Sequence, residues 1–199
     1  MSKQRKIHNR NSVRIIGGKW RSRKIYFPDS QGLRPTADRS RETLFNWLAP
    51  YIQGANCIDL FAGSGALCFE ALSRGAKSAI LIDRSPEVVA QLRKSATELQ
   101  AENIEIYCAH IPEAPPPFSP QTFDIIFVDP PFKHNLAGPS CAWLEKHHCL
   151  KPGSLVYFEV ESDSRSLPIP EHWETLRHKV AGQVAYYLVE VKLNFFPPI

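Results

Sequence analysis

Two short motifs combine residue types that could act on a nucleobase, and the first is Asp129-Pro130-Pro131-Phe132. It follows the apolar run Ile125–Val128, so it stands at the end of a predicted strand. Two consecutive prolines fix a rigid turn in which the carboxylate of Asp129 and the carbonyl of Pro130 can converge. Two acceptors beside the flat ring of Phe132 suit an exocyclic amino group, whose lone pair they would help to aim at an electrophile. We therefore predict Asp129, Pro130 and Phe132 as catalytic residues.

The second motif is Asp59-Leu60-Phe61-Ala62-Gly63-Ser64-Gly65, which is typical of a strand that runs into a glycine turn and a helix. Glycine at 63 and 65 lets the backbone pass close beneath a nucleoside and present N–H groups at the start of a helix. Asp83 ends the next apolar run, where a carboxylate can hold both hydroxyls of a ribose. Because position 68 is Cys, the third glycine of a dinucleotide fingerprint is missing. An adenosine without a pyrophosphate therefore fits better than NAD.

The elements that must position these motifs alternate along the chain from Cys57 onward. Strands are predicted over 57–61, 78–82, 104–108, 123–128 and 155–160, and helices over about 66–74, 85–99 and 141–149. Two further runs, 173–180 and 185–193, alternate like a closing antiparallel pair. This order predicts an α/β fold with a seven-stranded, mostly parallel, doubly wound sheet and a C-terminal antiparallel strand pair. Five prolines within 112–120 argue against a helix there and favour an extended polyproline segment.

The N-terminal part of the chain has a different character. Short apolar pairs within 13–27 flank Gly17-Gly18 and predict a small basic β-hairpin. We therefore divide the chain into a basic extension over 1–32 and a main domain over 33–199. Pro35-Thr36 is predicted to open the helix that leads into this domain, and Pro50 to end it.

Charge is distributed unevenly between these parts. Residues 1–50 hold twelve Lys and Arg against three Asp and Glu, a net +9, whereas the remainder carries twelve against seventeen, a net −5. A basic head on an acidic body favours contact with a polyanion, and Trp20 and Tyr26 could stack on bases. The predicted nucleic-acid-binding residues are Arg14, Lys19, Arg21, Arg23, Lys24, Arg34, Arg39 and Arg41. For the last three, pairing with Asp38 and Glu42 across helical turns is the alternative.

Composition excludes several classes of protein. The aliphatic runs are too short to span a bilayer, and no apolar segment follows the basic N-terminus as it would in a secretory signal. The five cysteines are widely spaced, without a CxxC pair, so we expect buried or partly buried thiols and no metal site. A cytoplasmic monomer without membrane contact is expected. Glu159 and Glu161 follow a buried strand and could line a substrate mouth, but no chemistry is assigned to them.

Three further blocks make the two motifs more specific: RIIGGKWRSRK at 14–24, LRPTADRSRETLFNWL at 33–48 and KVAGQVAYYL at 179–188. With DLFAGSG and DPPF they resemble the bacterial 16S rRNA guanine-N2 methyltransferases of the RsmD type, within the class I S-adenosylmethionine-dependent methyltransferases. The resemblance covers about 13–191. It departs from the family at Cys108, where a polar residue commonly precedes the position of Ala109, and in the proline-rich segment 112–120.

The resemblance implies a cofactor, a substrate and a role for each motif. The cofactor would be S-adenosylmethionine, with S-adenosylhomocysteine as product and no metal, bound by Asp59, Phe61, Gly63, Gly65, Asp83 and Ala109. Asp83 would hold the ribose, and Asp129, Pro130 and Phe132 the target amine and its base. The target would be guanine-966 of 16S rRNA, either as naked RNA or within an assembling or assembled small ribosomal subunit.

Two alternatives stay open at this stage. DPPF is shared with methyltransferases of other base amines, and nothing in it chooses among guanine N2, adenine N6 and cytosine N4. An RNA-binding assembly factor that keeps the fold without catalysis is the alternative from another class of protein.

Overall fold

The computed structural model of the protein describes residues 11–28, 38–132, 134–162 and 169–192. Its helices are α1 (Asp38–Leu48), α2 (Ala66–Ser73), α3 (Pro86–Leu99) and α4 (Ala137–Lys146). Its strands are β1 (Ser12–Arg14), β2 (Lys24–Tyr26), β3 (Asn56–Asp59), β4 (Ser78–Asp83), β5 (Ile104–Cys108), β6 (Ile125–Val128), β7 (Leu155–Glu161), β8 (Trp173–Ala181) and β9 (Val184–Val191).

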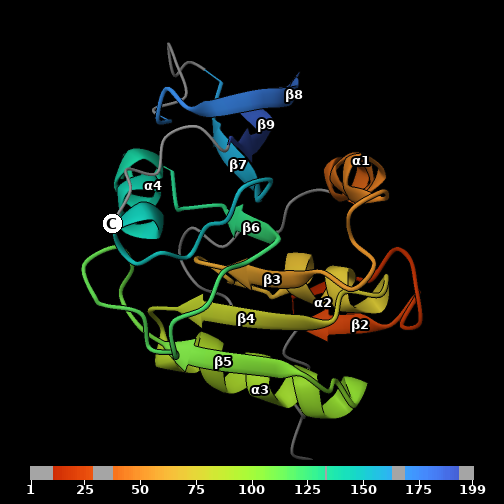
Figure 1. Ribbon diagram of the computed structural model, residues 1–199. Coiled ribbons are helices and arrows are strands. Elements are labelled where there is room, and N and C mark those ends of the chain that lie inside the picture. The colour runs from red at the N-terminus through yellow and green to blue at the C-terminus, as the bar shows by residue number, and fades with distance from the viewer. Residues whose placement is uncertain (1–10, 29–37, 133, 163–168, 193–199) are drawn as a thin grey trace, which may run out of the picture.

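Seven of these strands form one sheet in the order β5-β4-β3-β6-β7-β9-β8, and the other two form the separate hairpin β1-β2 (Figure 1). Neighbours from β5 to β7 are parallel, whereas β9 is antiparallel to both β7 and β8. The predicted fold class is confirmed. The strand order reverses between β3 and β6, and such a switch point is where open α/β sheets bind ligands.

The helices cover both faces of the sheet. Because successive residues of a strand point to opposite faces, the apolar side chains form two clusters, one on each face. One cluster joins apolar residues of α1, α2 and α3 to Cys57 and Phe127. The other joins α4 to Ile58 and Ile126. The alternation follows from the two-residue period of a strand and makes the strands near the switch point apolar on both faces.

The hairpin β1-β2 belongs to the same core as the sheet. It pairs Val13 with Ile25. Both side chains are buried with Ile15, Trp20 and Phe27 in the cluster that contains α1 and α2. The hairpin was predicted, but the stacking of Trp20 on bases was wrong, because only 7% of this side chain's surface is exposed.

Two connecting segments differ in detail from their predictions. Residues 109–124 contain no helix, as the prolines indicated, but their extended course is interrupted by a turn in which Ala114 N–H donates to His110 O at 2.8 Å. Helix α4 begins at Ala137, four residues before its predicted start. The predicted start of the first helix at Pro35-Thr36 lies outside the described residues.

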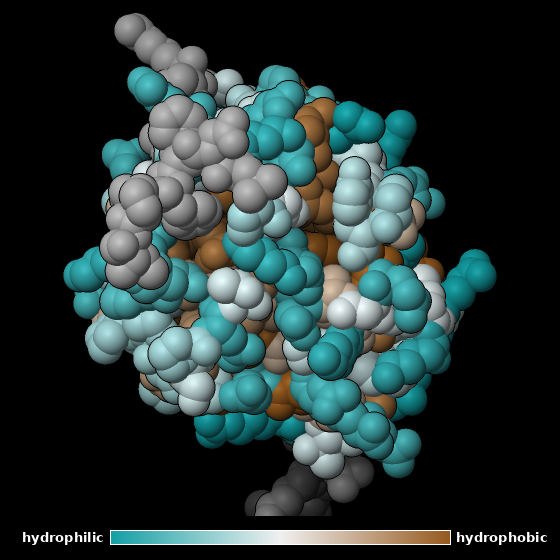
Figure 2. All heavy atoms as spheres, in the orientation of Figure 1, coloured by the Kyte–Doolittle hydropathy of each residue, from teal (hydrophilic) through white to brown (hydrophobic). Residues whose placement is uncertain are grey.

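The surface and the thiols complete the description. On the face drawn in Figure 2, hydrophilic side chains cover most of the surface and hydrophobic ones show mainly in its hollowed central part. None of the helices in the described part of the chain could cross a membrane.

Four cysteines are buried as expected, but Cys108 is exposed, because it ends the edge strand β5. Burial raises the pKa of the Cys141 thiol to about 12.

Candidate functional site

Four adjacent parallel strands place the predicted cofactor-binding and catalytic residues at their carboxyl ends, on one side of the sheet. Asp59 ends β3, Asp83 ends β4, Ala109 follows β5 and Asp129 follows β6. Because parallel strands place their carboxyl ends on the same side, these residues lie in a row across the switch point. The structure therefore places the glycine turn and the DPPF motif on neighbouring strands.

The glycine turn is tied to Asp83 by backbone hydrogen bonds. Gly63 N–H donates to Oδ2 of Asp83 at 3.0 Å, and Ser85 N–H donates to Oδ1 at 2.8 Å. The backbone oxygen of Asp83 accepts from Ala109 N–H at 3.1 Å. The carboxylate is thereby fixed and half-buried between the turn, the start of α3 and the end of β5.

Gly65 is where the turn packs most closely on the helices. Its φ of 76° lies in the left-handed region, and a Cβ there would come within 2.6 Å of Leu92 and Phe69. Any other residue would strain the backbone and displace the side chains of Leu92 and Phe69. The turn is therefore held at a fixed height above the start of α2.

Asp59 lies beneath this turn rather than on the surface. Only 2% of it is exposed, and its Oδ1 accepts from Phe61 N–H at 3.1 Å. Burial raises the pKa of Asp59 to about 7; the hydrogen bond from Phe61 lowers it and the charge of Asp83 raises it. Asp59 shapes the loop from below, which is the kind of role that the resemblance implies for it.

These residues fit a nucleoside cofactor. The oriented carboxylate of Asp83 is an acceptor suited to ribose hydroxyls, and the close backbone approach at Gly63 and Gly65 leaves no side chain over the turn. Phe61 and Ala109 are half-buried at the same edge and could contact the cofactor's apolar surface. Within the described ranges, no group of three or more His, Cys, Asp or Glu side chains could hold a metal ion.

The DPPF motif stands across the switch point from this turn. Asp129 is half-buried, Pro130 is buried, and 41% of Phe132 is exposed. The ring of Phe132 is therefore accessible from solution. One further acidic residue lies beside the motif: Val128 pairs with Phe158 in the parallel register, so the next residues, Asp129 and Glu159, are level with one another.

Glu159 was expected from the sequence to line a substrate mouth, without any chemistry assigned to it, and the structure places it level with Asp129. Only 6% of it is exposed, and Oε2 accepts a hydrogen bond from the Tyr157 hydroxyl at 3.3 Å. A polar residue at the end of the apolar run of β7 was the available signal, because carboxylates are seldom buried without a partner or a function.

The predicted nucleic-acid-binding residues fall into three groups. Arg34 lies outside the described residues. Exposed positions are held by Arg14, Lys19, Arg21, Arg23, Lys24 and Arg39. Arg41 is fully buried, so its prediction as an RNA contact was wrong, and the pairing alternative describes it correctly.

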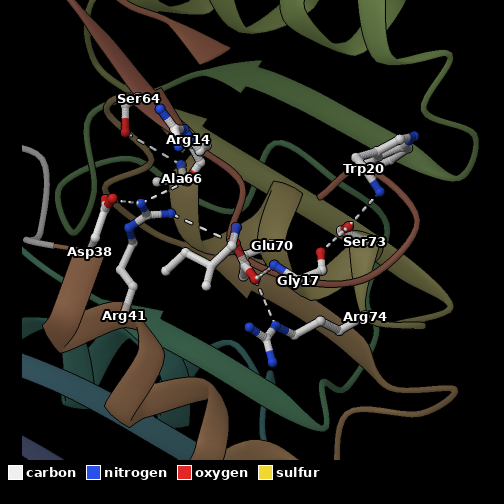
Figure 3. Close-up of polar contacts among 11 residues, drawn as sticks. Arg14, Gly17, Trp20, Asp38, Arg41, Ser64, Ala66, Glu70, Ser73 and Arg74 are labelled. Carbon is white, nitrogen blue, oxygen red and sulfur yellow. Dashed lines mark hydrogen bonds and ion pairs between the residues drawn. The ribbon is translucent and has the colours of Figure 1, made fainter. Parts of the chain in front are cut away.

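Arg41 is buried because it serves a network that holds the hairpin to α2 (Figure 3). Its Nη2 donates to Asp38 Oδ1 at 2.6 Å and to the backbone oxygen of Arg14 at 2.8 Å, and its Nη1 lies 3.7 Å from Glu70 Oε2. The buried Glu70 also accepts from Arg74 Nε at 2.7 Å and from two hairpin N–H groups, those of Ile16 and Gly17.

The turn of the hairpin lies at the amino ends of the parallel strands, whereas Asp129 lies at their carboxyl ends. Lys19 N–H donates to Ser73 O at 2.8 Å at the end of α2, and Arg23 Nη2 donates to Glu98 O at 2.6 Å in the last turn of α3. Because each of these helices runs back against its parallel strand, the helix ends lie at the amino ends of the strands. The exposed cations of this turn therefore do not lie next to the DPPF motif.

Comparison with known proteins gives matches along nearly the whole chain. The family model "Conserved hypothetical protein 95" matches residues 13–190. Ribosomal RNA small subunit methyltransferase D of Escherichia coli (strain K12) is 47% identical over 181 residues, 89% of each chain. The protein of the same name from Haemophilus influenzae is 42% identical over 193 residues, 96% of this chain and all of that one. The solved structure of yhhF from E. coli has a TM-score of 0.83 at 45% identity and covers 92% of this chain and 99% of that one.

Proposed function

The chain belongs to the conserved hypothetical protein 95 family, and from this we propose that it transfers a methyl group from S-adenosylmethionine to the N2 amine of a guanine in 16S rRNA. The names of the relatives support the reaction class and the small-subunit rRNA substrate. The guanine, its N2 atom and position 966 rest on the resemblance of the sequence motifs.

One observation carries this proposal: two turns follow neighbouring strands at the switch point. The glycine turn, whose Gly63 is hydrogen-bonded to Asp83, follows β3, and the turn that begins with Asp129-Pro130 follows β6. A nucleoside cofactor over the first turn and an amine over the second would lie within reach of one another. Neither turn alone has this meaning, because glycine turns and strand-ending prolines occur in many folds.

The residues of the chain would act by positioning. S-adenosylmethionine supplies a methyl group on a positively charged sulfur, which is already an activated leaving group. Asp83 would hold the ribose, while the Asp129 carboxylate and the Pro130 carbonyl would accept from the two N–H groups of the amine and aim its lone pair. Phe132 would lie against the base after it is turned out of its stack. The proton can leave once the nitrogen has become cationic, so Asp129 need not remove it first.

The first test is the variant Asp129→Ala. It should reduce methyl transfer to small-subunit RNA by about a hundred- to a thousandfold, because the amine loses an acceptor that acts in the transition state. Binding of S-adenosylmethionine, measured by calorimetry, should stay within a few-fold of the wild-type value. The matched control is Asp124→Ala, which removes a carboxylate from the opposite end of β6, where Asp124 accepts from Asn56 N–H. The control should keep its activity per folded molecule.

Two outcomes would contradict the proposal. Normal turnover by Asp129→Ala would show that the motif does not hold the amine. Undetectable binding of S-adenosylmethionine by the wild-type protein would instead favour the assembly factor that keeps the fold without catalysis.

A further inference from the structure

A small recess lies between helix α1 and the C-terminal strands of the sheet. Helix α1 lines it with Ser40, Thr43 and Trp47, and the strands line it with Lys179 and Tyr186. Its volume is about 10 Å³, which is hardly room for one water molecule. A base is far too large for this space, whereas a single ligand atom can meet the half-buried polar side chains at its mouth.

Strand pairing connects the recess to the predicted catalytic residue. Asp129 is level with Glu159 on β7. Glu159 pairs with Tyr186 on β9, which in turn pairs with Lys179 on β8. Side chains paired across strands point to the same face, and here α1 covers that face, because Ser40 Oγ donates to the Tyr186 hydroxyl at 3.0 Å. With neighbouring strands about 4.8 Å apart, the backbones at Asp129 and Lys179 are separated by roughly 14 Å.

Lys179 brings a positive charge to the recess and is oriented there by α1. Its Nζ donates to Oγ1 of Thr43 at 3.1 Å. Oγ1 of Thr43 in turn donates to the backbone oxygen of Arg39 at 3.0 Å. Because an ammonium group has three N–H donors, it can keep this contact while it binds an anionic oxygen.

The strand pair around Lys179 is cationic. Residues 175–189 include Arg177, His178 and Lys179 but no Asp or Glu. Arg177 pairs with Leu188, which lies in the core cluster that contains α1, so its side chain starts from the same face as Lys179. Arg39 is exposed on α1, one turn before Thr43. Phosphate is the anion that RNA offers to such a group of cations.

The row from Asp129 to Lys179 changes from acidic to basic, which matches the two ends of a nucleotide. The carboxylate at one end suits an amino group, and the ammonium at the other suits a phosphate oxygen. Tyr186 lies between them. Its pKa is raised mainly by burial; the hydrogen bond from Ser40 lowers it, and the charges of Glu159 and Asp129 raise it. The acidic end of the row therefore reaches the recess, and a nucleotide whose amine lies at Asp129 can extend its backbone toward Lys179.

Resting on the proposed function, we propose that Lys179 binds a backbone phosphate of the RNA next to the target guanine. Thr43 orients the ammonium group, and the contact positions the target nucleotide relative to Asp129 after its base has been turned out. Lys179 thus supplies a cation at the carboxyl ends of the strands, where the turn of the hairpin β1-β2 does not reach.

The test combines Lys179→Gln with RNA that lacks one backbone charge. Small-subunit RNA is prepared with an uncharged methylphosphonate linkage at each phosphate that flanks the target guanine, one at a time. At one of these linkages the wild-type protein should lose roughly ten- to a hundredfold in kcat/KM, the effect of one hydrogen bond to a charged group. Lys179→Gln should lose a similar factor on unmodified RNA and nothing further at that linkage.

Two further variants separate the charge of Lys179 from a structural role. Lys179→Arg keeps the charge and should stay within a few-fold of the wild-type kcat/KM. The matched control is Lys192→Gln, which removes the same charge at the other end of the strand pair, where Lys192 pairs with Glu174 and Glu190. The control should keep the wild-type kcat/KM and the wild-type loss at the sensitive linkage. Binding of S-adenosylmethionine should be unchanged in all three variants.

Two results would overturn the proposal. The first is an equal loss at every linkage in the wild-type protein and in Lys179→Gln, because the lysine would then be independent of the phosphates. The second is a defect of Lys179→Gln that appears only when ribosomal proteins are present, because the cation would then contact a protein.

The proposal stays testable if Lys179→Gln does not fold. Thr43→Val removes the hydroxyl that orients the ammonium group, so it should lose part of the preference for the charged linkage, and a full preference would contradict the proposal. Label on a base other than guanine would refute the proposed function, while the loss at each linkage is still measured in the same reactions. If no methyl group is transferred, filter binding of the same RNAs measures the dependence on Lys179.

Discussion

Burial of Asp59 beneath the glycine turn shows how a single residue at this site is perturbed by its surroundings. Its usual pKa of 3.8 is raised to about 7, chiefly because the carboxylate is removed from water. Between these two values the native protein binds a proton that the unfolded chain does not. The free energy of unfolding therefore falls as the pH rises from about 4 to 7 and is constant above that, as far as Asp59 is concerned.

This linkage predicts the behaviour of Asp59→Asn in the protein without cofactor. At pH 8 the variant should unfold with a free energy about 2 kcal/mol above that of the wild-type protein, because it no longer buries a charge. The difference should shrink as the pH is lowered from 7 toward 5, where Asp59 is protonated. Urea unfolding at pH 5 and pH 8 measures both values.

The control for this experiment is Glu102→Gln, at an exposed position after α3. Its effect should be the same at the two pH values. A difference between Asp59→Asn and wild type that does not change with pH would contradict the linkage assigned to Asp59.

At the scale of elements, the side chain of Glu70 on α2 is a central contact of the hairpin. Glu70 is fully buried, and it receives the Ile16 and Gly17 N–H groups at 2.7 and 2.8 Å while lying close to Arg41 and Arg74. The charge of Arg41 is buried as well, and it is compensated by Asp38 at 2.6 Å and by Glu70 at 3.7 Å. Helix α1, helix α2 and the hairpin therefore meet at a single charged contact.

Glu70→Ala should accordingly be strongly destabilising. We expect a loss of about 3–5 kcal/mol in the free energy of unfolding, because two hairpin N–H groups would lose their acceptor and Arg74 and Arg41 would each lose a carboxylate of a buried network. Urea unfolding measures the loss. Glu98→Ala, which removes an exposed residue 3.9 Å from Lys94, is the control and should cost less than about 1 kcal/mol. A loss below about 1 kcal/mol for Glu70→Ala would contradict the role assigned to Glu70 in holding the hairpin.

Sequence patterns predicted the elements with local signals and missed those that depend on distant contacts. The strands of the sheet and the DPPF and glycine turns were predicted because apolar runs, glycines and prolines act on their own neighbours. Burial of Arg41 and Trp20 was missed, because it depends on Glu70 and Ser73, which lie far from them in sequence. The single Glu within the apolar helix sequence ALCFEALS was the signal that could have pointed to a buried ion pair.

At the scale of the molecule, the positive charge of residues 1–50 is divided between structural and surface roles. Arg41 is used inside the fold, whereas Arg21, Arg23 and Lys24 are exposed on the hairpin. The hairpin turn lies at the amino ends of the parallel strands and Asp129 at their carboxyl ends. RNA that touches both would therefore have to extend along the molecule. An RNA helix or the surface of a small ribosomal subunit fits this description better than a short single strand of RNA.

The expected contribution of these cations is electrostatic. The affinity for small-subunit RNA should fall steeply as salt rises, and replacing Arg21, Arg23 and Lys24 by Gln should lower the slope of log K against log salt by about 2. Filter binding at several salt concentrations measures the slope, and calorimetry should show unchanged binding of S-adenosylmethionine. An unchanged slope would place the RNA contact elsewhere on the protein.

The central claim is that this chain methylates the N2 amine of a guanine in small-subunit rRNA, and nucleoside analysis tests it most directly. Small-subunit RNA, with and without its ribosomal proteins, is incubated with the protein and S-adenosylmethionine carrying a tritiated methyl group, then digested to nucleosides. The label should appear in N2-methylguanosine in at least one of the two substrates. Label in N6-methyladenosine, in N4-methylcytidine or in no nucleoside would contradict the account.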